Sequence, residues 1–134
     1  GPVRVIATHL DNRINPAARA RQLAPVVAHA AAWDGPVVIG GDMNTSPFVW
    51  LGHLIAVPAG VQDDRLERAV RAAGLDTPVR RSAATSQWLN MRLDAIYTRG
   101  VTAGGFAVED SVRISDHLPM WLDVALPSAA GDQG

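Results

Sequence analysis

The sequence predicts an α/β fold, and three observations support this. A strand, a helix and a second strand follow one another near the N-terminus, at 3–8, 17–33 and 36–42. From Thr85 onward the pattern becomes β-like. The 134-residue chain is 48% hydrophobic and 19% charged, which is typical of one globular domain and excludes intrinsic disorder as its general state.

The first expected strand, 3–8, is a short β-branched run that places His9 at its carboxyl end. Asn15 followed by Pro16 is typical of a helix N-cap with proline in the first turn. We therefore expect the segment 17–33 to be a helix that returns the chain to the start of the next strand.

The second expected strand, 36–42, is a continuous apolar run of the buried type that closes on two glycines and Asp42. Turn-forming residues follow at 44–47. The order of strand, helix and strand predicts a parallel crossover unit, with polar side chains at the carboxyl ends of both strands.

The rest of the chain is expected to hold one more helix and several strands. Apolar residues recur at helical spacing within 64–73, with Asp63 as the expected N-cap, whereas 48–60 is expected to be mainly loop. The expected strands are 92–97, 106–108 and 118–126. We expect one domain over 1–127 and a disordered tail over 128–134, which is small and polar.

Polar clusters stand at the ends of four apolar runs. They are Thr8-His9, Gly41-Asp42-Met43-Asn44, Arg92-Leu93-Asp94 and Ser115-Asp116-His117. Taken singly they are weak signals, because strand-ending histidines are mostly structural and Asp or Asn beside glycine mostly shapes a turn. Asp94 is more informative, because it interrupts an apolar strand, and an unpaired buried carboxylate there would cost several kcal/mol.

Asp94 therefore needs a partner such as histidine or arginine. His117 enters the final expected strand, and adjacent strands would bring the two side chains together. We predict that their heavy atoms lie roughly 2.6–3.2 Å apart. We also predict that the carboxylate of Asp94 raises the pKa of His117.

The clusters together supply carboxylates, an amide and imidazoles, without a Ser or Cys nucleophile dyad. This set suits metal-assisted hydrolysis by water, and the oxygen ligands favour Mg²⁺, with Mn²⁺ as the alternative. A zinc hydrolase using His9, Asp42 and His117 is a further alternative, although no His-x-x-x-His spacing is present. The absence of cysteine excludes thiolate chemistry, and no apolar run reaches the length of about 20 residues that spans a bilayer.

Four ordered motifs resemble the C-terminal half of the endonuclease/exonuclease/phosphatase family, the deoxyribonuclease I-like phosphoesterases. They are Thr8-His9-Leu10, Gly40-Gly41-Asp42-Met43-Asn44, Arg92-Leu93-Asp94-Ala95-Ile96-Tyr97 and Ser115-Asp116-His117-Leu118-Pro119. The resemblance implies half of a two-sheet α/β sandwich, with a mixed β-sheet and outer helices. It also implies hydrolysis of phosphodiesters or phosphomonoesters with a divalent cation, usually Mg²⁺.

The resemblance further implies a role for each polar residue. Asp42 would orient or activate the attacking water and contribute to the metal site, Asn44 would hold a phosphate oxygen, and Asp116 would be a metal-side carboxylate. His9 would bind another phosphate oxygen or act as an acid toward the leaving group.

The final pair, Asp94 and His117, would act as a unit. His117 would contact the scissile phosphate, as base or as transition-state stabiliser. Asp94 would fix the tautomer of that imidazole and support its positive charge.

In the family, an Asn and the Glu that is the main Mg²⁺ ligand lie in the first half of the fold, and neither has a counterpart here. We therefore expect a phosphoesterase fragment whose partner is the missing N-terminal half and which is inactive alone. The alternative is a non-catalytic half-domain that acts as a binding or assembly module. The substrate stays open among nucleic acid, phospholipid and small phosphoesters, although the net charge of −1 disfavours a strongly attracting nuclease.

Overall fold

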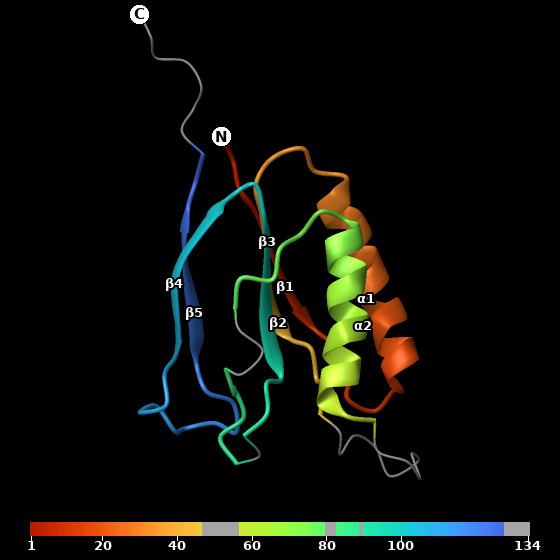
Figure 1. Cartoon of the computed structure of the whole chain (residues 1–134), viewed down its shortest axis with the longest axis vertical. Helices are drawn as coiled ribbons and strands as arrows, with labels where there is room; N and C mark the ends of the chain where they lie inside the picture. The colour runs from red at the N-terminus through yellow and green to blue at the C-terminus, as the bar shows by residue number, and fades with distance from the viewer. Residues whose placement is uncertain (47–56, 80–82, 89, 128–134) are drawn as a thin grey trace, which may run out of the picture.

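The computed structural model describes residues 1–46, 57–79, 83–88 and 90–127. In chain order its elements are β1 (Arg4–His9), α1 (Pro16–Ala31), β2 (Val37–Asp42), α2 (Ala59–Ala72), β3 (Asp94–Arg99), β4 (Thr102–Val108) and β5 (Met120–Ala125). The two helices lie on one side of the sheet formed by β1, β2 and β3, and the β4–β5 pair lies on its other side (Figure 1).

The first sheet is mixed and the second is antiparallel, which confirms the predicted fold class. The strand order of the first sheet is β1-β2-β3, with β1 parallel to β2 and β2 antiparallel to β3. The parallel pair is joined through α1, as the strand–helix–strand order predicts. The second sheet pairs β4 with β5.

Helix α1 begins where the sequence predicts, because the side chain of Asn15 accepts a hydrogen bond from the amide of Ala18 at 2.8 Å. Helix α2 begins earlier than predicted. Pro58 is its N-cap, and Asp63, the expected cap, lies buried inside the helix. Neither helix is both long and apolar enough to cross a membrane, and the described residues contain no other candidate span.

The three later strands exist but their bounds differ from the prediction. β3 begins at Asp94 instead of 92, because the Arg92 guanidinium turns into the interior and its Nη1 lies 3.4 Å from Oε1 of Glu67 on α2. β4 begins four residues before the predicted start at 106, since its Gly104 and Gly105 obscure the β pattern. The expected tail, 128–134, lies outside the described residues, as does most of the expected loop before α2.

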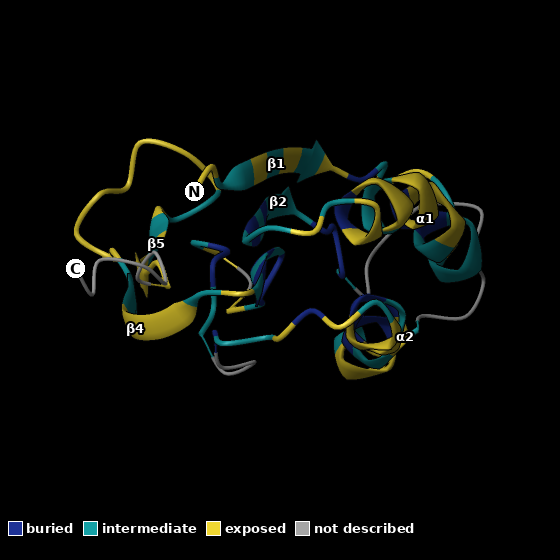
Figure 2. Ribbon diagram, turned by 90° about the horizontal axis from the view of Figure 1, so that it is seen from above, coloured by how far each residue is buried: buried dark blue, intermediate teal, exposed yellow. Residues whose placement is uncertain are grey.

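The hydrophobic core lies between the first sheet and the two helices (Figure 2). Val37 and Ile39 of β2 are fully buried, and so are Leu23 of α1 and Val70 of α2. The opposite face of the sheet is more open, and Val5 of β1 is 74% exposed there. The chain therefore has one packed face and one partly open face, and the polar edge described next belongs to the open one.

Candidate active site

The register of the first sheet places three polar residues in one row. His9 pairs with Asp42 across β1 and β2, and Asp42 pairs with Asp94 across β2 and β3. Residues directly opposite one another in a sheet project from the same face. All three side chains therefore lie together at one edge, where β1 and β2 end and β3 begins.

This row lies on the face away from the helices. Side chains alternate along a strand, so Ile39 points into the core whereas Gly40 and Asp42 point to the other face. A hollow of about 380 Å³ adjoins the row on that face, between the sheet and the residues that lead into β5. It is lined by Gly40, Gly41, Asp94, Ile96, Leu118, Pro119 and Met120.

Gly41 makes the close approach of β1 and β2 possible just before the row. Its φ of 149° lies in a region that side chains rarely adopt, and a Cβ there would lie 1.8 Å from the carbonyl oxygen of Thr8. Any larger residue would push β1 away from β2. The glycine that the sequence placed before Asp42 is thus required for the geometry that brings His9 to Asp42.

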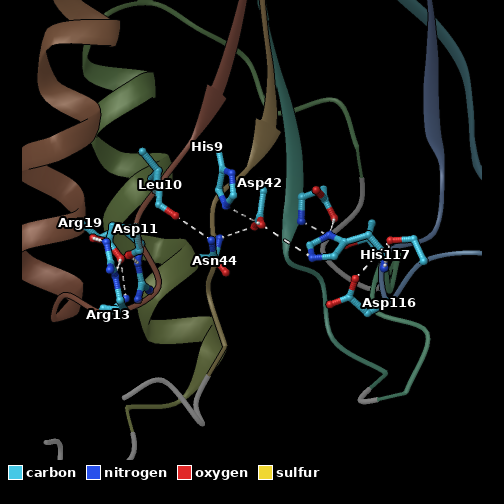
Figure 3. A network of polar contacts seen from close by, with 12 residues as sticks. His9, Leu10, Asp11, Arg13, Arg19, Asp42, Asn44, Asp116 and His117 are labelled. Carbon is cyan, nitrogen blue, oxygen red and sulfur yellow. Dashed lines mark hydrogen bonds and ion pairs between the residues drawn. The ribbon is translucent and has the colours of Figure 1, made fainter. Parts of the chain in front are cut away.

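Four side chains follow one another across this edge, His9, Asp42, His117 and Asp94. Nε2 of His9 lies 3.4 Å from Oδ2 of Asp42, and Nε2 of His117 lies 3.7 Å from the same oxygen (Figure 3). The other ring nitrogen of His117, Nδ1, lies 2.8 Å from Oδ2 of Asp94. The predicted contact between Asp94 and His117 is confirmed.

Burial and neighbouring charges shift the pKa values of two of these four side chains, His117 and Asp42. Burial by itself lowers the pKa of His117, but the hydrogen bond to Asp94 and the charges of Asp94, Asp42 and Asp116 outweigh it, so the pKa is raised above its ordinary value. Burial raises the pKa of Asp42, against the hydrogen bond from the Asn44 amide, which lowers it. An imidazolium at His117 is therefore favoured.

Asn44 lies directly beside Asp42. Its backbone amide donates to Oδ1 of Asp42 at 2.8 Å, and its side-chain Nδ2 donates to the carbonyl oxygen of Leu10 at 2.6 Å. The residue has a left-handed φ of 50°, a conformation that asparagine tolerates better than most residues. One amide hydrogen of Asn44 thus ties the end of β2 to the end of β1.

Three of the candidate site residues form a group that could hold a cation, although only Asp42 among them is a metal-side residue of the sequence prediction. Asp42, Asp94 and His117 each offer one ligand atom, and these atoms lie within 4.8 Å of one another. The carboxylate oxygens suit a hard divalent cation such as Mg²⁺ or Mn²⁺. His9 and Asp116 lie outside this group, which is the one such group among the described residues. His9 and His117 both approach Oδ2 of Asp42, but the ligand atoms of His9, Asp42 and His117 do not all lie within 4.8 Å of one another.

Asp116 differs from the other candidates in its exposure. It lies on the exposed segment before His117, and its Oδ1 accepts a hydrogen bond from the hydroxyl of Ser115 at 3.1 Å (Figure 3). Its charge contributes to the raised pKa of His117. Asp116 thus adjoins the site electrostatically without joining the group of three.

Arg19, which no sequence pattern singled out, holds the segment that follows β1. Its side chain is only 1% exposed, and it donates to the carbonyl oxygens of Asp11 and Ile14 and to Oε1 of Gln62 on α2. Arginine on an expected amphipathic helix is ordinarily assigned to the solvent face, so no local pattern could have found it.

Comparison with known proteins gives one family match. The family model described as "Endonuclease/Exonuclease/phosphatase family" matches residues 2–117. A comparison with curated proteins finds no match.

Solved structures share the fold at low identity. The endonuclease domain of TRAS1, a telomere-specific non-LTR retrotransposon, is 20% identical with a TM-score of 0.62, over 88% of this chain and 54% of that one. The mannosyl-6-phosphatase of Bacteroides thetaiotaomicron is 16% identical with a TM-score of 0.55, over 91% and 51%. A functionally unknown conserved protein from Enterococcus faecalis is 18% identical with a TM-score of 0.57, over 92% and 50%.

These likenesses support the two-sheet α/β arrangement. The chain spans about half the length of the solved structures that it matches.

Proposed function

The chain belongs to the endonuclease/exonuclease/phosphatase family, and on this premise we propose that it supplies the acid–base part of a metal-dependent phosphoesterase site. The reaction is hydrolysis of a phosphodiester or phosphomonoester by an activated water. The observation that carries the proposal is the continuous series His9, Asp42, His117 and Asp94, with 2.8 Å between the last two.

His117 is the residue that meets the scissile phosphate. Its raised pKa favours the imidazolium, which can offset the negative charge that develops on phosphorus-bound oxygens in the transition state. Asp94 would hold the Nδ1 proton and leave Nε2, which lies 3.7 Å from Oδ2 of Asp42, for the phosphate. The same pair can alternatively move a proton, because a positioned imidazole near neutral pH serves as acid or base.

Asp42 orients the attacking water. Its Oδ1 accepts a hydrogen bond from the Asn44 amide, whereas its Oδ2 faces both imidazoles, and we assign the water to Oδ2. We assign to Asn44 the binding of a phosphate oxygen, through the amide hydrogen that the carbonyl oxygen of Leu10 does not accept. His9, whose side chain is 77% exposed, would bind another phosphate oxygen or protonate the leaving group.

The metal-side residues of the proposal are Asp42 and Asp116. Asp94 is already engaged by His117, so Asp42 is the member of the group of three that is available to a cation. A bound Mg²⁺ or Mn²⁺ would supply charge neutralisation at the phosphate. The resemblance implies a further carboxylate ligand, a Glu, which we propose comes from outside this chain.

The site indicates a phosphate ester as the class of substrate. The donors and imidazoles recognise the phosphate group itself, which nucleic acid, phospholipid and small phosphoesters share. The chain carries a net charge of −1, so binding of a polyanion would depend on local contacts.

The experiment is a hydrolysis assay on the product of the full open reading frame that encodes this chain. Bis(4-nitrophenyl) phosphate and 4-nitrophenyl phosphate serve as diester and monoester probes, with Mg²⁺, with Mn²⁺ and with a chelator. We expect turnover that needs the cation and that falls by about 10²–10⁴-fold in Asp42→Asn. Turnover that persists with chelator, or in Asp42→Asn, would refute the proposal and favour a non-catalytic module.

A further inference from the structure

Thr85 joins the two segments that carry Asp94 and His117. Its side chain is fully buried, and its Oγ1 accepts hydrogen bonds from the amides of Leu93 at 2.9 Å and Asp94 at 3.0 Å. These amides lie at the point where β3 begins. The hydroxyl oxygen therefore fixes the backbone from which the Asp94 carboxylate projects.

The backbone of the same residue holds the segment that carries His117. The carbonyl oxygen of Thr85 accepts a hydrogen bond from the amide of Leu118 at 2.7 Å. Ser86 forms an antiparallel bridge with His117, and the amide of Gln87 donates to the carbonyl oxygen of Asp116 at 2.9 Å. Residues 85–87 thus lie alongside 116–118 in an isolated antiparallel bridge.

Thr85 is held in turn by its own amide, which donates to the carbonyl oxygen of Met91 at 2.9 Å. Thr85 therefore contacts both segments of the pair. Its side chain accepts from the backbone at Asp94, and its carbonyl oxygen accepts from the backbone next to His117. Asp94 and His117 are 23 positions apart in the chain, so their approach depends on such a bridge.

We propose that Thr85 is a positioning residue whose hydroxyl oxygen sets the Asp94–His117 hydrogen bond. Its role in catalysis rests on the proposed function, whereas its effect on the geometry of the pair does not. Valine has the shape of threonine without the oxygen, so Thr85→Val would take the Thr85 acceptor away from one buried and one partly buried amide at the start of β3. The start of β3 would shift, and Nδ1 of His117 would lose its aligned partner.

The test of geometry uses NMR of the 134-residue chain. We expect the Nδ1 proton of His117 to give a resolved low-field signal in the wild type and in Thr85→Ser, which keeps the hydroxyl. The signal should broaden or vanish in Thr85→Val, with faster hydrogen exchange of the Leu93 and Asp94 amides. Thr98→Val is the matched control, because it removes a buried threonine hydroxyl at the other end of the same strand.

Each outcome of this test is decisive. An unchanged low-field signal in folded Thr85→Val, equal loss in Thr85→Ser, or equal loss in Thr98→Val would overturn the proposal. Where Thr85→Val does not fold, Thr85→Ala makes the same comparison. Fast exchange of the Leu93 and Asp94 amides in the wild type would also overturn the proposal, without any variant.

The catalytic part is measured on the full reading-frame product. Thr85→Val should lower kcat by about 100-fold with little change in KM, because misplacement of a reacting group affects the transition state more than substrate binding. Thr85→Ser should restore most of the rate. If the wild type shows no hydrolysis, the proposed function fails while the NMR result stands; if hydrolysis is present and Thr85→Val is unaffected, the positioning role fails instead.

Discussion

Nδ1 of His117 lies 2.8 Å from Oδ2 of Asp94, although only Asp94 belongs to a strand of a sheet and His117 is 23 positions further along the chain. Asp94 opens β3 in the first sheet, whereas His117 lies just before β5 in the second. Both side chains are largely buried, at 19% and 29% exposure, so water competes weakly for this contact. The pair therefore links the start of β3 to the segment that leads into β5, at the edge where the candidate site lies.

The first prediction concerns the pKa of His117. Asp94→Asn keeps the shape of the side chain and removes the charge, so the imidazolium loses its main support and the titration midpoint of His117 should fall. The measurement is an NMR titration of the His117 ring, with a chelator present. Asp34→Asn, an exposed substitution at the opposite end of the sheet, is the control and should leave the midpoint unchanged. An unchanged midpoint in Asp94→Asn would contradict the assigned cause.

The second prediction concerns the pH dependence of stability. Because the pKa of His117 is raised in the folded chain, its protonation contributes stability that is fully present below the unfolded value of about 6.5. That contribution is lost as pH rises through the folded pKa. Urea unfolding should show a free energy of unfolding that falls over this range in the wild type and falls less in His117→Gln. His29→Gln, on the exposed side of α1, should follow the wild type.

The pattern of the sequence was sufficient for the elements near the site. The cap at Asn15, the apolar run into Asp42 and the crossover between them depend on local chemistry, and the structure confirms each of them. The start of α2 depends instead on Pro58, which has no polar side chain to mark it as a helix cap. The first residues of β4 were not predicted as a strand, because its paired glycines carry no β pattern and its partner strand is 12 or more positions away.

The sequence predicts which polar residues end the strands and one contact between them, that of Asp94 with His117. The need of Asp94 for a partner led to His117, because burial of a lone carboxylate is costly whatever the fold. The sheet register that aligns His9 with Asp42 could not be read in advance, since it depends on the close approach at Gly41. The role of Thr85 could not be predicted from the sequence, because it depends on hydrogen bonds to residues distant in the chain.

The third prediction concerns the two faces of the first sheet. Val37 and Val5 lie on neighbouring strands, but Val37 is fully buried against the helices and Val5 is 74% exposed. Val37→Ala should lower the free energy of unfolding by about 2 kcal/mol, from lost burial and the cavity left behind. Val5→Ala should change it by less than about 0.5 kcal/mol. Equal losses in urea unfolding would show that the open face is part of the core.

The fourth prediction concerns the 134-residue chain by itself. We expect little or no Mg²⁺-dependent hydrolysis of bis(4-nitrophenyl) phosphate, because a principal carboxylate ligand is proposed to come from outside it. The same assay on the full reading-frame product is the comparison. Equal turnover by the two would show that the residues within this chain suffice.

The most direct test of the central claim compares two histidine variants of the full reading-frame product. His117→Ala removes the imidazole held by Asp94, and His29→Ala removes an exposed imidazole on α1. In steady-state hydrolysis of bis(4-nitrophenyl) phosphate with Mg²⁺, we predict that His117→Ala lowers kcat by about 10²–10⁴-fold while His29→Ala keeps the wild-type rate. A near-normal rate in folded His117→Ala would contradict the account and remove His117 from the chemistry.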